Sequence, residues 1–399
     1  MRIALISAQR RTENGELRAE LMLAGRSILA WQAELMCALG AERVICLCHA
    51  VEGEVLRLQH MVEAAGAAFH ALIGFTALPA LVRAEDDLII LSDGLLPDPP
   101  LTQNIVTTEA GWRRNVVCLP AGHAMVASAP DDFERIDAAH NWAGLLVMRG
   151  ASVQRLSDFA EDADAVSVLL RLALQAGTPL RELGAAELEA GGWLLANSGA
   201  TLEKHERDLI SRAAAARDFR APLITLAGWI VETFAPRGLQ KGTSVTGGLA
   251  LALALSAVMV AALGAPVISL AFAAAAMFSG ALTLAYAGIA RRLHRQSGPG
   301  SAEAAFAVAL DALAALTLWF ALVPLPEWSA LAMCGPLLIG LARLSAREEG
   351  EVPLSAFWRD RASLLVLLAS AASAGLLPEA TAAFAATALG ALLLGKRRD

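Results

Sequence analysis

Charged side chains are missing from one long segment of this 399-residue chain. From Val245 to Ala290 the sequence runs for 46 residues without Asp, Glu, Lys or Arg. A transmembrane helix needs about 20 apolar residues, and Gly264-Ala265-Pro266 interrupts the run near its middle. The segment therefore predicts two membrane-crossing helices joined by a tight turn.

Three further absences narrow the functional class. There is no excess of basic residues, and the formal net charge of −7 argues against nucleic acid as a partner. The five cysteines lack the spacing of a zinc site, and Cys46 and Cys48 lie in an apolar run, which predicts buried, reduced thiols. The first residues, MRIALISAQRR, lack the order and length of a signal peptide. We therefore expect the first half in the cytoplasm.

The apolar residues are concentrated in the second half of the chain. Residues 1 to about 215 carry most of the charges, whereas six apolar stretches follow one another at roughly 245–264, 267–290, 304–323, 329–343, 362–377 and 380–395. Basic residues follow the second, fourth and sixth stretches, while the other three connections hold no Lys or Arg. The positive-inside rule then predicts six crossings of the inner (plasma) membrane, with both termini cytoplasmic.

Two segments connect the halves. Residues 200–217 are charged and Ala-rich, as in a helical connector, and residues 220–234 include the apolar side chains of Trp229 and Phe234. The second segment suits a helix lying in the membrane interface. The expected division is 1–199, 200–243 and 244–399.

In the first half, apolar segments with strand and helix patterns alternate. Strands are expected at 3–7, 43–48 and 87–91, and helices at 29–39 and 53–65, which predicts a mostly parallel α/β sheet covered on both faces. Ser92-Asp93-Gly94 follows the third strand, where open α/β sheets place their ligands. Asp93 is a candidate ligand for a divalent cation beside a nucleotide phosphate. A simple Asp-Gly turn explains the same residues.

This half resembles the sugar-phosphate nucleotidyltransferases. The segments that carry the resemblance are RIALISA, LAGRSILAWQAELMCALGAERVICL, DDLIILSDG, WAGLLVMRGASVQRLSDF, LLRLALQAGTPLREL and GGWLLANS. The resemblance implies a Rossmann-like fold and a glycine-rich loop, Gly-x-Gly-Thr-Arg, that wraps the nucleotide phosphates. Here that loop, 7–15, has one glycine, and Arg18 stands where the family has a lysine. Arg10, Arg11 and Arg18 are the remaining candidates for binding phosphate.

The second half resembles the CDP-alcohol phosphotransferases, which occur fused to nucleotidyltransferases in enzymes that make inositol-phosphate lipids. Their motif is D-G-x2-A-R-x8-G-x3-D-x3-D, in which acids hold two metal ions and one acid accepts the proton of the attacking alcohol. Ala290-Arg291 and Gly300 keep the spacing, but the acid positions are occupied by Tyr286, Ala304 and Val308.

Glu303 and Asp311 are the nearest carboxylates, and neither is in register with the motif. A carboxylate inside an apolar helix is costly and invites a functional interpretation. Pairing of Asp311 with an arginine is the structural alternative.

Basic residues also gather after the second apolar stretch. Arg291, Arg292, His294 and Arg295 could bind a lipid phosphate or a cytidine diphosphate headgroup. Ordinary positive-inside charge explains the same cluster.

Two functions remain open. The first is an inner-membrane protein descended from the fused enzyme, catalytically degenerate and acting in binding or assembly in phospholipid synthesis. Its expected partners are membrane lipid, a CDP-alcohol or nucleotide, and an active paralogue or a second copy of the chain. The alternative is an active phosphotransferase that uses Mg²⁺ or Mn²⁺ with Glu303 and Asp311 as ligands.

Overall fold

A computed structural model describes residues 1–109, 111–160, 163–189, 192–213, 219–293, 300–323, 332–347 and 355–394. The chain divides into two compact units, Met1–His205 and Glu206–Asp399. The division falls within a single helix, α8 (Gly199–Ala213).

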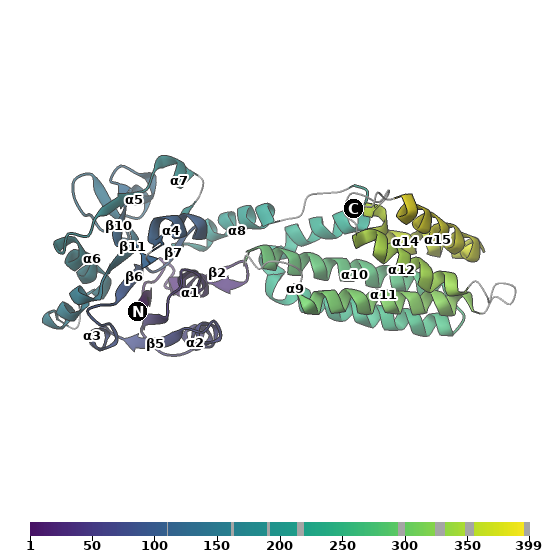
Figure 1. Cartoon of the computed structure of the whole chain (residues 1–399), viewed down its shortest axis with the longest axis horizontal. Helices are drawn as coiled ribbons and strands as arrows, with labels where there is room; N and C mark the ends of the chain where they lie inside the picture. Colours follow the sequence, from purple (N-terminus) through teal and green to yellow (C-terminus); the bar gives the residue numbers. More distant parts are fainter. Residues whose placement is uncertain are drawn as a thin grey trace. The chain divides into compact units, whose positions relative to one another are not determined.

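Unit 1 is built on a seven-stranded sheet (Figure 1). Its strand order is β12-β10-β11-β6-β1-β4-β5, and every neighbouring pair is parallel except the two made by β11. The strands of this sheet are β1 (Arg2–Ala8), β4 (Arg43–Cys48), β5 (Ala68–Ile73), β6 (Asp87–Leu91), β10 (Asn115–Pro120), β11 (His140–Arg149) and β12 (Leu180–Glu182).

Three two-stranded ribbons and several short helices complete the unit. The ribbons pair β2 (Met22–Leu23) with β3 (Arg26–Ser27), β7 (Leu95–Pro97) with β13 (Trp193–Leu195), and β8 (Thr107–Thr108) with β9 (Gly111–Trp112). The helices are α1 (Ile28–Ala38), α2 (Glu54–Ala64), α3 (Leu78–Leu81), α4 (Pro99–Val106), α5 (Ala124–Ser128), α6 (Ala165–Gln175) and α7 (Ala185–Glu189), with 3-10 helices η1 (Arg18–Glu20) and η2 (Gly150–Asp158).

The sheet is covered on both faces because its central strands β1, β4 and β6 are mostly apolar, and each is buried at every position after its first. On β1, Ala4 and Ile6 pack in one core with α1 and α2, while Ile3 and Leu5 pack in another with η2 and α6. Figure 1 shows α1 and α2 on one side of the strands and α3 and α6 on the other. The sequence prediction of a mostly parallel, doubly covered sheet is thereby confirmed.

Unit 2 is helical throughout its described residues. Its helices are α9 (Pro222–Ala262), α10 (Pro266–Leu293), α11 (Ser301–Leu322), α12 (Cys334–Arg347), α13 (Ser355–Arg359), α14 (Arg361–Ser373) and α15 (Leu377–Leu394). Residues 220–234, expected as a separate interfacial helix, lie almost entirely in the first part of α9. Gly264, with φ of +80°, makes the predicted turn between α9 and α10.

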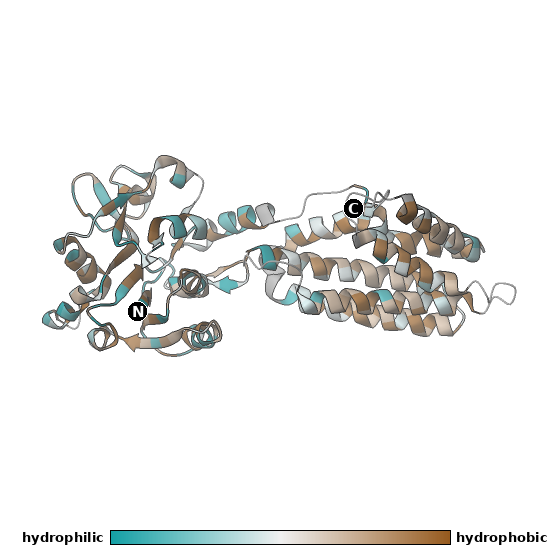
Figure 2. Ribbon diagram, viewed as in Figure 1, coloured by the Kyte–Doolittle hydropathy of each residue, from teal (hydrophilic) through white to brown (hydrophobic). Residues whose placement is uncertain are grey.

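Within the described residues of unit 2, three segments are long and apolar enough to cross a membrane: Lys241–Ala262, Pro266–Leu293 and Ser301–Leu322. Figure 2 shows that α10 and α11 are apolar over most of their length. The other three predicted crossings correspond to shorter apolar helices, Cys334–Ala346, Arg361–Ser373 and Leu377–Leu393. A helix of 14 residues, such as α12, spans only about 21 Å, so six complete crossings are not established by helix length.

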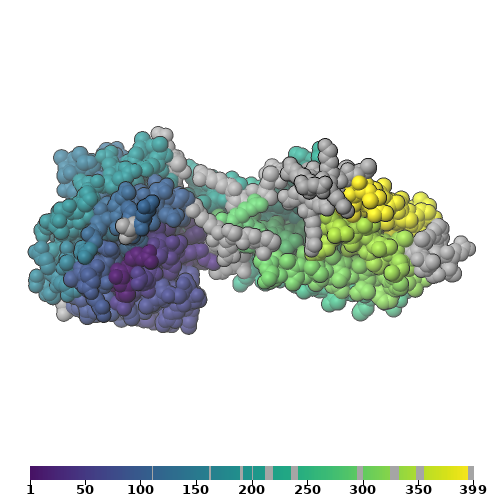
Figure 3. Space-filling model, in the orientation of Figure 1, coloured from purple at the N-terminus to yellow at the C-terminus, as the bar shows by residue number. Residues whose placement is uncertain are grey.

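One apolar core of unit 2 is shared by most of its helices. Residues of α10, α11, α12, α14 and α15 contribute to it, and α12 and α15 pack along each other (Figure 3). Trp358 is 1% exposed within this core. Asp360 is fully buried and joins two helix starts: its carboxylate accepts hydrogen bonds from Leu223 N (2.8 Å) in α9 and from Ser363 N (3.1 Å) in α14.

Candidate functional site

The candidate site of unit 1 lies at the carboxyl ends of β1 and β6. The chain places β4 and β5 on one side of β1 and then returns to place β6 on the other. Such a reversal leaves a crevice beyond the carboxyl ends of the two central strands, where open α/β sheets bind ligands. The loop after β1 and the Ser92-Asp93-Gly94 turn after β6 both lie there.

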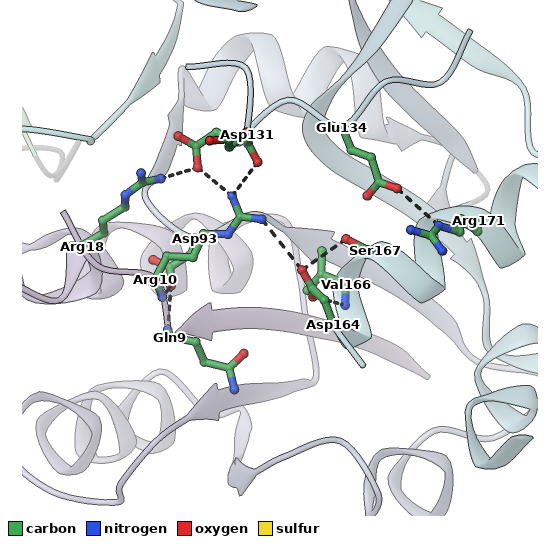
Figure 4. Close-up of polar contacts among 11 residues, drawn as sticks. Gln9, Arg10, Arg18, Asp93, Asp131, Glu134, Asp164, Val166, Ser167 and Arg171 are labelled. Carbon is green, nitrogen blue, oxygen red and sulfur yellow. Dashed lines mark hydrogen bonds and ion pairs between the residues drawn. The ribbon is translucent and has the colours of Figure 1, made fainter. Parts of the chain in front are cut away.

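Asp93 holds the loop that follows β1. One of its carboxylate oxygens, Oδ2, accepts hydrogen bonds from the backbone N–H groups of Gln9 and Arg10, each at 2.7 Å (Figure 4). Gly94 has φ of +77°, and a Cβ there would lie 3.1 Å from the carbonyl oxygen of Ala196. Glycine therefore fits both the positive φ of this turn and the close approach of the Ala196 carbonyl oxygen. The turn places the Asp93 side chain next to the loop after β1.

The other oxygen of Asp93, Oδ1, is buried and has no hydrogen-bond partner among the described residues. The residue is only 3% exposed. Burial raises the pKa of Asp93 to about 6, against the opposing effect of the Arg10 and Gln9 amides and the Arg18 and Arg10 charges. An unpartnered acceptor in this setting is costly unless a ligand or water supplies a donor.

Arg10 and Arg18 are engaged by carboxylates of the same unit. Both guanidinium groups bind Oδ1 of Asp132 at 2.6 Å, and Arg10 also lies 3.8 Å from Oδ2 of Asp164. Figure 4 shows the Arg10 side chain reaching toward Asp164. Asp164 in turn caps α6 by accepting a hydrogen bond from Val166 N at 3.0 Å.

A cavity of about 330 Å³ opens beside these residues. Its lining includes Arg10, Asp93 and Asp164, the hydroxyl residues Ser7 and Ser92, and the rings of His49 and Phe75. Nε2 of His49 lies 3.0 Å from the carbonyl oxygen of Gln9. The volume falls at the lower end of the range for small-molecule sites.

The predicted phosphate ligands of unit 1 do not meet inside the cavity, although Arg10 and Arg18 share Asp132. Arg10 lines the cavity, whereas Arg18 and Arg11 are absent from its lining. The exposed Arg11 donates a hydrogen bond to the carbonyl oxygen of Gly15 at 2.6 Å. Arg18 is largely buried, with 12% of its side chain exposed in its ion pair with Asp132.

In unit 2, Asp311 is held between two arginines. Its carboxylate forms ion pairs with Arg343 and with Nε of Arg361, the latter at 2.7 Å. The residue is 7% exposed. This is the arginine pairing that the sequence offered as the structural alternative to a catalytic role.

The other candidates of unit 2 also lack the arrangement of a metal site. Glu303 pairs with Arg291 at 2.9 Å, and Val308 is 49% exposed. Tyr286 is buried and packs against Gly242 of α9, where an added Cβ would lie 2.9 Å from the ring. Arg292 lies in the last turn of α10, whereas His294 and Arg295 fall outside the described residues.

Across the described parts of both units, no three His, Cys, Asp or Glu side chains are grouped so that they could hold a metal ion. The candidate metal ligands do not form one group. Asp93 lies in unit 1, and Glu303 and Asp311 lie in α11 of unit 2. Donors of the protein bind all three carboxylates.

Comparison with known proteins adds little to this description. No protein-family model matches the chain, and no curated protein matches it significantly. Among solved structures, the inositol-1-phosphate CTP transferase from T. maritima matches with 13% sequence identity, covering 51% of this chain and 96% of that chain. The TM-score is 0.36, too low for that structure to carry an argument about this one.

Several site residues could not be anticipated from local sequence. Asp132 and Phe75 lie in loops whose sequence gives no signal of a site. Asp164 could have been found, because an Asp directly before the apolar run of α6 is the signature of a helix N-cap. Asp360 carries the same signature before α14, although nothing in the sequence points to its second partner in α9.

Proposed function

We propose that this protein is a membrane-anchored binding or assembly component of phospholipid synthesis that has lost phosphotransfer chemistry. One observation carries the proposal: the acids at each candidate site are bound by the protein's own donors. Asp93 accepts two backbone amides, and Asp311 pairs with two arginines. The arginines compete with a cation for Asp311, and among the described residues neither acid belongs to a group of three potential ligands. Mg²⁺ needs several oxygen ligands in near-octahedral geometry.

The membrane part of the proposal rests on three apolar helices that are long enough to span a bilayer. We place unit 2 in the inner membrane with both termini in the cytoplasm, because the basic residues of the sequence fall on one side of the six apolar stretches. The exposed Trp229 and Phe234 at the start of α9 supply an interfacial anchor.

We assign the protein to phospholipid synthesis because both sequence halves resemble a known fusion of a nucleotidyltransferase with a CDP-alcohol phosphotransferase. Ala290-Arg291 and Gly300 keep the phosphotransferase spacing, while Tyr286 fills a metal position with a buried ring. An active enzyme using Glu303 and Asp311 would have to break ion pairs with Arg291, Arg343 and Arg361 to free these ligands. Binding or assembly requires no such rearrangement.

The direct test is release of CMP from CDP-diacylglycerol by the purified full-length protein, with a panel of polyol and polyol-phosphate acceptors and Mg²⁺ or Mn²⁺. We expect no release above a control without protein. Metal-dependent release that Asp311→Asn abolishes, in a variant that retains the wild-type unfolding temperature, would establish the alternative.

A further inference from the structure

His140 stands between two carboxylates near the edge of the unit 1 sheet. It is the first residue of β11, and its Nδ1 lies 3.0 Å from both carboxylate oxygens of Asp137. Its Nε2 lies 3.1 Å from Oε2 of Glu182, the last residue of β12. Both ring nitrogens therefore face a hydrogen-bond acceptor.

Only a protonated His140 ring satisfies both contacts. A neutral imidazole carries one N–H group and one lone pair, whereas the imidazolium carries two N–H groups. Because each carboxylate needs a donor, a neutral ring would set its lone pair against one of them. The hydrogen bond to Asp137, together with the charges of Asp137 and Glu182, raises the pKa of His140 above its usual 6.5.

The contact with Glu182 is the one that a neutral ring would lose. Asp137 is fixed by backbone donors, because its Oδ1 accepts the N–H groups of Ala139 at 2.7 Å and of His140 at 2.8 Å. Its two oxygens then keep the single ring proton on Nδ1. Nε2 would turn its lone pair toward Glu182, whose side chain is 52% exposed and can rotate toward water.

The other charged groups around this contact have partners of their own. Nε of Arg135, in the loop before β11, donates to a backbone carbonyl oxygen of the same loop at 2.9 Å. Arg181 of β12 pairs with Glu187 of α7 at 2.9 Å. Cys118 lies on β10, between β11 and β12, and burial raises its pKa to about 11. The thiol therefore stays neutral over the range in which His140 titrates.

His140 joins two chain segments that both reach the candidate site. The loop before β11 carries Asp132, the partner of both site arginines. The chain after β12 leads to β13 and then to Ala196, whose N–H group donates to the carbonyl oxygen of Gly94 at 2.8 Å. A change of charge on His140 therefore acts on segments that hold the site.

The strand β12 is short and has few other attachments. Its three residues are all exposed, and among the described strands they pair only with β10. The next residue, Leu183, is buried and donates its N–H group to the carbonyl oxygen of Cys118 at 2.9 Å. Loss of the ion pair between His140 and Glu182 would therefore loosen β12 from the sheet.

We propose that His140 is a pH-sensitive switch: its imidazolium holds β12 at the edge of the sheet, and loss of the proton from Nε2 releases the strand. The stabilisation of β12 is complete below the ordinary pKa of 6.5 and is lost as the pH rises through the raised pKa of the folded state. This switch is independent of metal binding and of phosphotransfer.

The first measurement is the pKa of each histidine in the full-length protein in detergent. Hydrogen–deuterium exchange at the imidazole C2 position, resolved by peptide mass spectrometry, gives these values. We expect His140 to titrate above 6.5 and its pKa to fall in Glu182→Gln, because the charge is lost and the side-chain amide can donate to a neutral Nε2. A wild-type pKa at or below 6.5 would overturn the proposal.

The second measurement is backbone amide exchange over residues 180–183 at about pH 6 and about pH 9, corrected for the intrinsic exchange rate. In the wild type, we expect protection to fall by about two- to five-fold at the higher pH, as for loss of an exposed ion pair. His140→Gln and Glu182→Gln should each give the same protection at both pH values.

His123→Gln is the matched control for this measurement. His123 lies in the same unit at the start of α5, where its Nδ1 accepts the N–H group of Met125 at 3.3 Å. Its replacement should leave the wild-type pH profile unchanged. Protection that is equal at both pH values in the wild type, or a pH dependence that survives His140→Gln or disappears in His123→Gln, would contradict the switch.

Discussion

At the residue scale, buried carboxylates determine what each candidate site can do. Asp93 and Asp311 are 3% and 7% exposed, and each has partners supplied by the protein. Their settings differ, because Asp93 lacks a neutralising ion pair of its own whereas Asp311 has two. Removing the charge should therefore have opposite effects at the two positions.

For Asp93, the stability effect depends on pH. Its folded-state pKa of about 6 lies above the usual 3.8, so the folded state binds the proton more tightly than the unfolded state. The favourable contribution is complete below about pH 4 and is lost as the pH rises through 6, a difference of about 3 kcal/mol at most. The melting temperature of Asp93→Asn, relative to that of the wild type, should therefore rise as the pH is raised from 5 to 7. Melting curves that stay parallel across this range would contradict the argument.

For Asp311, removal of the carboxylate leaves Arg343 and Arg361 without their shared counter-ion inside the helical core. We expect Asp311→Ala to destabilise unit 2 by about 3–5 kcal/mol. Glu303→Ala breaks a pair whose side chains are 25% and 22% exposed and should cost about 1 kcal/mol or less. Unfolding of both variants in detergent measures the difference, and equal losses would count against a structural role for Asp311.

At the element scale, α9 and α10 pack closely through small residues. Tyr286 of α10 lies close enough to α9 that a Cβ at Gly242 would approach its ring to 2.9 Å. Ser279 Oγ donates to the carbonyl oxygen of Thr246 at 2.8 Å, which ties the same two helices together. Small residues permit this approach of helices in a bilayer.

Two glycines of α9 test this contact. Gly242→Ala should destabilise unit 2 by about 1–3 kcal/mol, because the added methyl group forces the Tyr286 ring to move. Gly248 lies further along the same helix, and a Cβ added there would have no atom within 4 Å, so Gly248→Ala should be neutral or stabilise by up to about 1 kcal/mol. Detergent unfolding of the two variants separates packing from helix propensity; destabilisation by both would refute the close contact.

The same scale shows how far the sequence can be interpreted. It predicts strands at 43–48 and 87–91 with the bounds that β4 and β6 have, because a buried parallel strand is a short apolar run between turns. The pairing of Arg10 with Asp132, 122 residues apart, follows from chain topology and has no local signal. The ion pair of Asp311 with Arg361 and the hydrogen bond between Asp360 and Leu223 also join residues far apart in the sequence. The sequence therefore points to the arginines near the site without the acids that neutralise them.

At the scale of the whole molecule, the protein combines an α/β unit with a helical unit suited to a membrane. The three short helices α12, α14 and α15 decide its topology, since only three of the described apolar helices reach the length of a span. Alkaline phosphatase fusions at residues 264 and 326 should be active, and fusions at 296, 350 and 399 inactive, if all six stretches cross. Activity at position 350 or 399 would show that a short helix fails to cross.

The central claim is that the three candidate metal ligands, Asp93, Glu303 and Asp311, are each engaged by donors of the protein and do not hold the metal that phosphotransfer requires. Titration of the full-length protein with Mn²⁺, followed by electron paramagnetic resonance in the presence of CDP-diacylglycerol, measures this most directly. We predict the same Mn²⁺ signal as for CDP-diacylglycerol and Mn²⁺ without protein, because the diphosphate of the lipid binds the ion by itself. Stoichiometric Mn²⁺ binding that is lost in Glu303→Gln or Asp93→Asn would contradict the account.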